Sequence, residues 1–88
     1  MTSHNPAGYY GLKLSELVEI EITQLDYFSL ASLINDLTYS LTPQGGDFAT
    51  NEVSTHAAYA IAHLSPIHMI KLLRWLAEIL EVKGNGQS

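Results

Sequence analysis

The sequence predicts a mainly α fold, a small bundle of three principal helices with a short N-terminal β-strand. Three observations predict it. Leucine, isoleucine and valine recur at spacings of three and four residues over most of the chain. Serine, threonine and proline stand where helices would begin, and glycine-rich turns separate the periodic stretches. With 88 residues, the chain is expected to bury only about 60–65% of its unfolded surface, so self-association would help it.

The composition is that of a folded chain, because 47% of the residues are hydrophobic and 15% are charged. No stretch approaches the roughly 20 apolar residues that a membrane span needs, so no membrane partner is expected. The absence of cysteine excludes disulfides and sulfur-based zinc sites. The start of the chain lacks the basic and apolar segments of a secretory signal, and we therefore expect a cytoplasmic protein.

The net charge of −5 argues against a polyanionic partner. Only four side chains are strong cations, too few to collect a phosphate backbone. They are Lys13, Lys71, Arg74 and Lys83. Direct binding to nucleic acid is therefore not favoured.

The composition of both ends of the chain predicts flexible segments. Residues 1–11 contain Pro6, Gly8 and Gly11 and no extended period, which predicts a flexible N-terminal arm. Residues 84–88 predict a flexible C-terminal tail. Residues 12–83 form the single helical domain.

The segment 17–23 fits two structures. Val18, Ile20 and Ile22 alternate with polar residues, as in a half-buried strand, and we favour the strand. Apolar residues here also fit helical spacing, and Ser15 could cap such a helix. A strand would have little to pair with inside the chain, and would therefore favour a dimer.

Two helices are predicted in the middle of the chain. The first runs over about 24–41, opened by a capping-box-like pair of Thr23 and Asp26. Its buried stripe is expected to contain Leu30, Leu33, Ile34, Leu37 and Leu41. The second runs over about 51–64. The turn between them, which includes 45–47, would also suit a recognition loop.

The third helix, over about 66–83, has the clearest boundaries. Ser65 suits the N-cap, Pro66 the first helical position and Gly84 a left-handed C-cap. Its polar residues occupy an arc of only roughly 80°, which leaves two apolar faces. The first face, expected against the other two helices, contains Met69, Ile70, Leu73, Leu76, Ala77 and Leu80.

The second apolar face of this helix is the predicted interaction site. It contains Leu72, Trp75, Ile79 and Val82, with His68 at its end. One interpretation is a seam against another protein, in the first place a second copy of this chain. The other is that the helix is central, flanked by both neighbours and partly by the N-terminal segment.

The sequence predicts no catalytic residue, metal ion or cofactor. His56 and His63 are expected to lie about 10 Å apart along one helix, too far for one metal ion. Glu52 and His56 at helical spacing fit a solvated ion pair better than a chelate. No nucleophile motif surrounds any serine or histidine.

We therefore expect a small acidic protein-interaction module, a regulator, adaptor or inhibitor that acts through an apolar helix face as a homodimer. The alternative is a helix-turn-helix transcriptional regulator that binds DNA as a dimer. Glu78 and Glu81 on the would-be recognition face argue against it. A third class, an enzyme of unspecified reaction, has no motif to support it.

Overall fold

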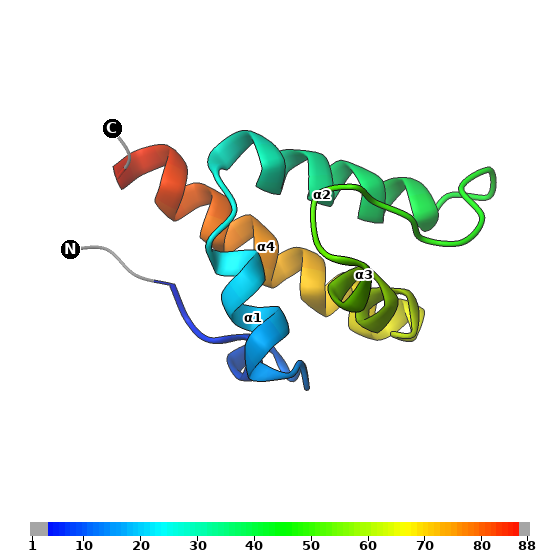
Figure 1. Cartoon of the computed structure of the whole chain (residues 1–88), viewed down its shortest axis with the longest axis horizontal. Helices are drawn as coiled ribbons and strands as arrows, with labels where there is room; N and C mark the ends of the chain where they lie inside the picture. The colour runs from blue at the N-terminus through cyan, green and yellow to red at the C-terminus, as the bar shows by residue number, and fades with distance from the viewer. Residues whose placement is uncertain (1–3, 87–88) are drawn as a thin grey trace.

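The computed structural model describes residues 4–86, which are mainly helical and contain no strand. A short 3-10 helix η1 spans Ala7–Tyr10, and four α-helices follow it. They are α1 (Glu16–Thr23), α2 (Tyr27–Ser40), α3 (Thr55–Ala62) and α4 (Pro66–Gly86). Helices α2 and α4 lie side by side, and α1 and α3 pack together below α2 in the view of Figure 1. No helix among these residues is both long and apolar enough to cross a bilayer.

The predicted strand over 17–23 is wrong, because this segment is α1. Ser15 caps the helix by accepting a 3.3 Å hydrogen bond from the Val18 N–H. A strand would put Val18, Ile20 and Ile22 on one face, whereas the helix buries only Val18 and Ile22 and turns Ile20 outward. The physical reason is pairing: the preceding segment is η1, which offers no strand edge.

Helix α2 begins three residues later than expected. Asp26 is its N-cap and accepts a 2.7 Å hydrogen bond from the Ser29 N–H, so Thr23 and Asp26 do not form a capping box. Thr23 instead closes α1, where its hydroxyl donates to the Ile20 carbonyl at 2.9 Å. The predicted stripe is largely confirmed, since Leu30, Leu33 and Leu37 are fully buried.

Helix α3 is shorter than predicted at both ends. It starts at Thr55 instead of near Asn51, because Ser54 is the N-cap and accepts a 3.2 Å hydrogen bond from the Ala57 N–H. Ser54 is itself held by α1, since its hydroxyl donates to Glu21 Oε1 at 2.8 Å. A carboxylate of one helix therefore fixes where another helix begins.

The start of α4 is confirmed at Pro66, with the Ser65 hydroxyl accepting from the His68 N–H at 3.3 Å. Its predicted end is wrong, because the helix continues through Gly84 to Gly86. The tail predicted for 84–88 is thus helical over 84–86, and residues 87–88 lie outside the described part of the chain.

The predicted flexible arm is packed against the domain where the structure describes it. Residues 1–3 lie outside the described range, but Ala7 is buried and belongs to the same core cluster as residues of α2 and α4. Gly11 ends η1 with φ 86°, a left-handed conformation that glycine adopts without strain. The arm is therefore part of the folded domain.

Paired substitutions in α1 test the helix against the strand. Ile22→Ala should lower the free energy of unfolding by about 2–5 kcal/mol, because the side chain is fully buried. Ile20→Ala should cost less than about 1 kcal/mol, since this side chain is 43% exposed. Urea denaturation followed by circular dichroism measures both values. Equal losses would indicate that the two side chains share a buried face.

Candidate interaction surface

The predicted interface on α4 is mostly covered by the chain itself. Leu72, Trp75 and Ile79 are buried, Val82 is half-buried, and only His68 is exposed. The five residues therefore do not form an open face on this chain, and the expectation that they are exposed is corrected. Of the central-helix interpretation, the packing of α4 against α2 and against the N-terminal segment is observed.

The cover over Trp75 is the N-terminal arm, which is bonded to α4 through polar groups. The Trp75 Nε1–H donates to the Asn5 carbonyl at 2.9 Å. The Asn5 N–H donates to Glu78 Oε2 at 2.9 Å, and the Tyr10 hydroxyl donates to Glu78 Oε1. The His4 ring meets the Trp75 ring edge-on, with centroids 6.1 Å apart. We call these five residues the arm latch.

The arm latch shifts the ionisation of its two acidic groups in opposite directions. The hydrogen bond from Tyr10, followed by the one from the Asn5 backbone, lowers the pKa of Glu78. The same bond to Glu78 raises the pKa of Tyr10, with burial as the next cause. The charges of Tyr9 and Arg74 also act on Tyr10, and the charge of His4 acts on Glu78. The bonded state is therefore a carboxylate with a neutral phenol.

An open groove lies elsewhere, between α3 and the loop that precedes it. The loop turns back sharply after α2, where a Cβ on Gly45 would stand 1.8 Å from the Tyr39 carbonyl oxygen, so only glycine fits. Further along, the Thr50 hydroxyl donates to Asp36 Oδ2 at 2.7 Å and ties the loop to α2. These contacts bring Phe48, 8% exposed, against the core.

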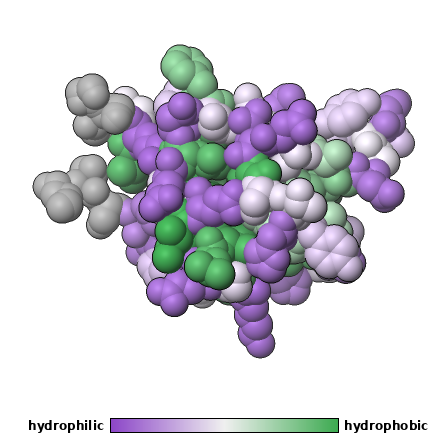
Figure 2. Space-filling view, in the orientation of Figure 1, coloured by the Kyte–Doolittle hydropathy of each residue, from purple (hydrophilic) through white to green (hydrophobic). Residues whose placement is uncertain are grey.

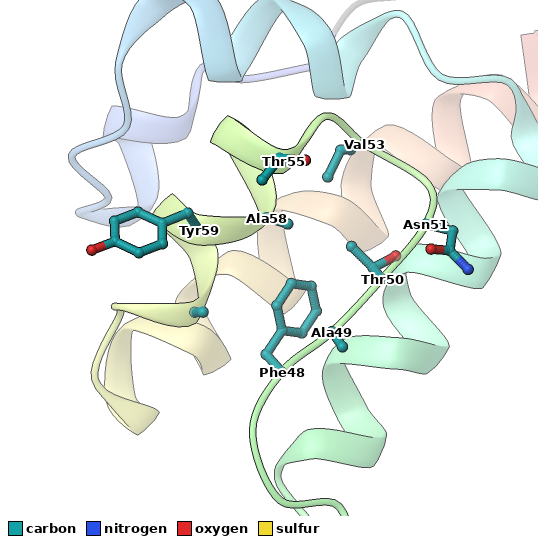
Figure 3. Close-up of a pocket in the computed structure, with 9 residues that line it drawn as sticks. Phe48, Ala49, Thr50, Asn51, Val53, Thr55, Ala58 and Tyr59 are labelled. Carbon is teal, nitrogen blue, oxygen red and sulfur yellow. The ribbon is translucent and has the colours of Figure 1, made fainter.

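Figure 3 shows the Phe48 ring between the loop and α3, while the Tyr59 ring projects away from it. The groove has a volume of about 440 Å³. It is lined by Phe48, Ala49, Thr50, Asn51, Val53, Thr55, Ala58, Tyr59 and Ala62. Small side chains on α3 leave the groove open, and its walls are a mixture of apolar and hydroxyl-bearing groups.

A second groove of about 450 Å³ adjoins the first, because Phe48 and Ala62 line both. It extends over the loop, where Gly46 and Asp47 line it, to the start of α4. The loop that the sequence suggested for recognition thus borders this groove. We call the two together the double groove.

One aromatic pair stands on the exposed side of α3. Tyr59 is 66% exposed, and its ring centroid lies 4.1 Å from that of His63. Tyr59 lines the first groove and His63 the second. The pair therefore forms an aromatic rim along the double groove, with exposed polar edges.

The histidines are spread over the surface instead of clustering. Glu52 precedes α3, so the helical spacing assumed for Glu52 and His56 does not apply. The His63 ring bonds the Tyr59 carbonyl at 2.9 Å, and His68 bonds the Ser65 hydroxyl at 2.8 Å. Over residues 4–86, no three His, Asp or Glu side chains stand close enough to hold a metal ion.

Apolar side chains are also exposed on the outer sides of α1 and α4. Leu17 on α1 is 74% exposed and Ile20 follows it one turn later. Ile67 and Ile70 are exposed at the start of α4. Figure 2 shows hydrophobic side chains gathered over and beside α1, among polar ones. Ile70 belongs to the predicted first face of α4, whereas Leu76 on the same face is fully buried, so this face is only partly covered.

Comparisons with known proteins give no guide to this surface. No protein-family model matches the chain, and neither a curated protein nor a solved structure is significantly similar to it.

The arm latch should hold between the lowered pKa of Glu78 and the raised pKa of Tyr10, and open at more acidic and more basic pH. Because the pKa of Glu78 is lowered, its ionised carboxylate stabilises the docked arm at pH values above the ordinary carboxyl range. This stabilisation is lost as the pH falls through the lowered pKa. Because the pKa of Tyr10 is raised, its neutral hydroxyl stabilises the docked arm below about pH 10. This stabilisation is lost as the pH rises through the raised pKa. Fluorescence of Trp75, the single tryptophan, should shift to longer wavelength at both limits.

The matched control for this titration is Glu78→Gln, which has no carboxyl group to protonate. Its fluorescence should lack the acidic transition seen in the wild type, while far-ultraviolet circular dichroism reports retained helix. An unchanged acidic transition in this variant would show that another group controls the environment of Trp75.

Proposed function

We propose that this chain is a small protein-interaction module, a regulator, adaptor or inhibitor, whose contact surface is the double groove. The observation that carries the proposal is the pair of adjoining grooves on either side of Phe48, rimmed by the exposed Tyr59 and His63. Aromatic side chains at a surface are typical anchors of protein interfaces, because they bury much area at small entropic cost.

The open shape of the double groove favours a protein partner over a small molecule. Sites for small ligands enclose most of the ligand surface. Here the grooves run along an exposed helix and an exposed loop, so an apolar side chain of a partner could lie in each. The partner would then reach the floor at Phe48 and contact Tyr59 from the side.

Charge suggests which segment of a partner would fit. Asp47 lines the second groove, Glu52 lies in the same loop, and the chain carries a net charge of −5. Complementary charge steers association and disfavours partners of like charge. We therefore expect a segment with apolar anchors flanked by lysine or arginine.

The DNA-binding alternative gains no specific support. The exposed side chains at the start of α4 include Ile67 and Ile70, which cannot donate hydrogen bonds to base edges. The four strong cations do not outweigh the acidic groups.

The variant Ala62→Arg tests the double groove. Ala62 is exposed, lines both grooves and ends α3, where a cation is favourable to the helix. A long guanidinium side chain there would obstruct both grooves, and we expect partner affinity to fall at least about 10-fold. Immobilised protein captures the partner from lysate of the native cell, and calorimetry with the purified partner measures the affinity.

Ala77→Arg is the matched control, an exposed alanine on α4 that lines neither groove. It should bind the partner like the wild type, and both variants should melt at the wild-type temperature. Equal retention of the partner by the Ala62→Arg and Ala77→Arg variants would exclude the double groove as the contact surface.

A further inference from the structure

We propose that the arm-binding face of α4 is a peptide site that takes the N-terminal arm of a second copy, so that two chains exchange arms and form a homodimer. The proposal deepens the proposed function by naming a second copy as one partner. It uses a surface separate from the double groove, so either proposal can fail without the other.

The face of α4 recognises the arm as a receptor recognises a peptide. Trp75 and Glu78, one helical turn apart, bind the carbonyl and the N–H of the same residue, Asn5. The side-chain amide of Asn5 adds weaker contacts to Glu78 at 3.3 and 3.5 Å. The N–H, the carbonyl and the side-chain amide of Asn5 are thus all bound by α4. Because Trp75 and Glu78 stand at a fixed distance along the helix, these bonds define the position and the direction of the bound segment.

The rest of the arm supplies apolar anchors and a contact with α1. Ala7, and Leu12 directly after the arm, are buried in the core. The Ala7 N–H donates to Glu19 Oε2 on α1 at 3.0 Å. The site therefore recognises a segment with an Asx-Pro start, a buried alanine and a tyrosine hydroxyl. A second copy carries all of these features.

The connection between the arm and α1 is short and surface-exposed in part. After the buried Leu12, Lys13 is exposed, and Ser15 already caps α1. Three residues span at most about 10 Å when extended. An exchange across this hinge would therefore bring the α1 helices of the two copies close to each other.

An independent observation points to the same arrangement. The exposed apolar side chains Leu17 and Ile20 follow this hinge directly. Neither side chain is buried in the core of the single chain. Figure 2 shows hydrophobic side chains gathered over α1. Arm exchange would cover them against the partner's α1, which gives the dimer apolar contacts that the closed chain lacks.

Mass action determines when exchange occurs. Each arm makes the same contacts in the closed chain and in the exchanged dimer, so the arm itself favours neither form. A short connection gives the chain's own arm an effective concentration of millimolar order. The closed monomer should therefore dominate at micromolar concentration, and the dimer should appear toward millimolar concentration or when the closed form is weakened.

Two complementary variants test the exchange. Ala7→Asp places a carboxylate at a buried position beside Glu19, so its own arm cannot dock while its α4 face is intact. Glu78→Lys removes the acceptor for Asn5 and Tyr10, so its arm is intact but has no site. At about 100 µM each variant alone should sediment as a monomer, and the mixture should contain a 1:1 heterodimer.

A synthetic peptide of residues 4–12 separates recognition of the arm from dimerisation. Quenching of Trp75 fluorescence should show that it binds the Ala7→Asp variant at least about 10-fold more tightly than the wild type, whose own arm competes. Asn5→Pro, which removes the N–H bonded to Glu78 without changing a buried residue, repeats the test if Ala7→Asp unfolds.

Leu17→Gln in both chains should weaken the heterodimer and leave peptide binding unchanged, because only the dimer covers α1. If the peptide binds neither the Ala7→Asp nor the Asn5→Pro variant, the proposed peptide site on α4 is wrong. Peptide binding without a heterodimer would overturn the second copy as its occupant. Ala62→Arg should not alter the heterodimer, so loss of partner binding through the double groove is measured separately.

Discussion

Burial of Trp75 is the constraint on which the rest of the structure depends. The indole lies wholly inside the domain, and a buried N–H needs an acceptor. No element of the helical core supplies it. The Asn5 carbonyl does, from 70 residues away in sequence. The N-terminal arm must therefore be part of the fold, and the face of α4 that the sequence suggests as an interface is covered by the chain's own segment.

Carboxylate side chains accept several of the hydrogen bonds that hold irregular segments to helices. Glu78 receives the arm, Glu19 receives the Ala7 N–H, and Glu21 receives the backbone and hydroxyl of Ser54. Hydrogen bonds to ionised acceptors are stronger than neutral ones. Within residues 4–86, these bonds connect segments of an acidic chain that has few cations. It also means that acid should loosen the connections before the apolar core, whose packing does not depend on charge.

Sequence reasoning succeeded where the decisive contacts are local and failed where they are distant. Ser65 and Pro66 specify the start of α4 by their own geometry, and the stripe of α2 follows from helical periodicity. Residues 17–23 satisfy both periods, and only the missing strand partner decides for a helix. The covering of Trp75 depends on a bond between Asn5 and α4. Phe48 is a large apolar residue in a polar loop, and this was the sequence feature that could have indicated the double groove. Its burial depends on the turn at Gly45, a contact that sequence periodicity does not show.

Helix α1 is the element that the arm site and the double groove share. It holds the arm through Glu19 and fixes the beginning of α3, which forms one wall of the grooves, through Glu21. Both carboxylates stand on a helix of little more than two turns. Its buried side, Val18 and Ile22, anchors it to the core, whereas Leu17 on the outer side is left to solvent. One short helix therefore supports both the N-terminal arm and the start of α3, through two carboxylates on its surface.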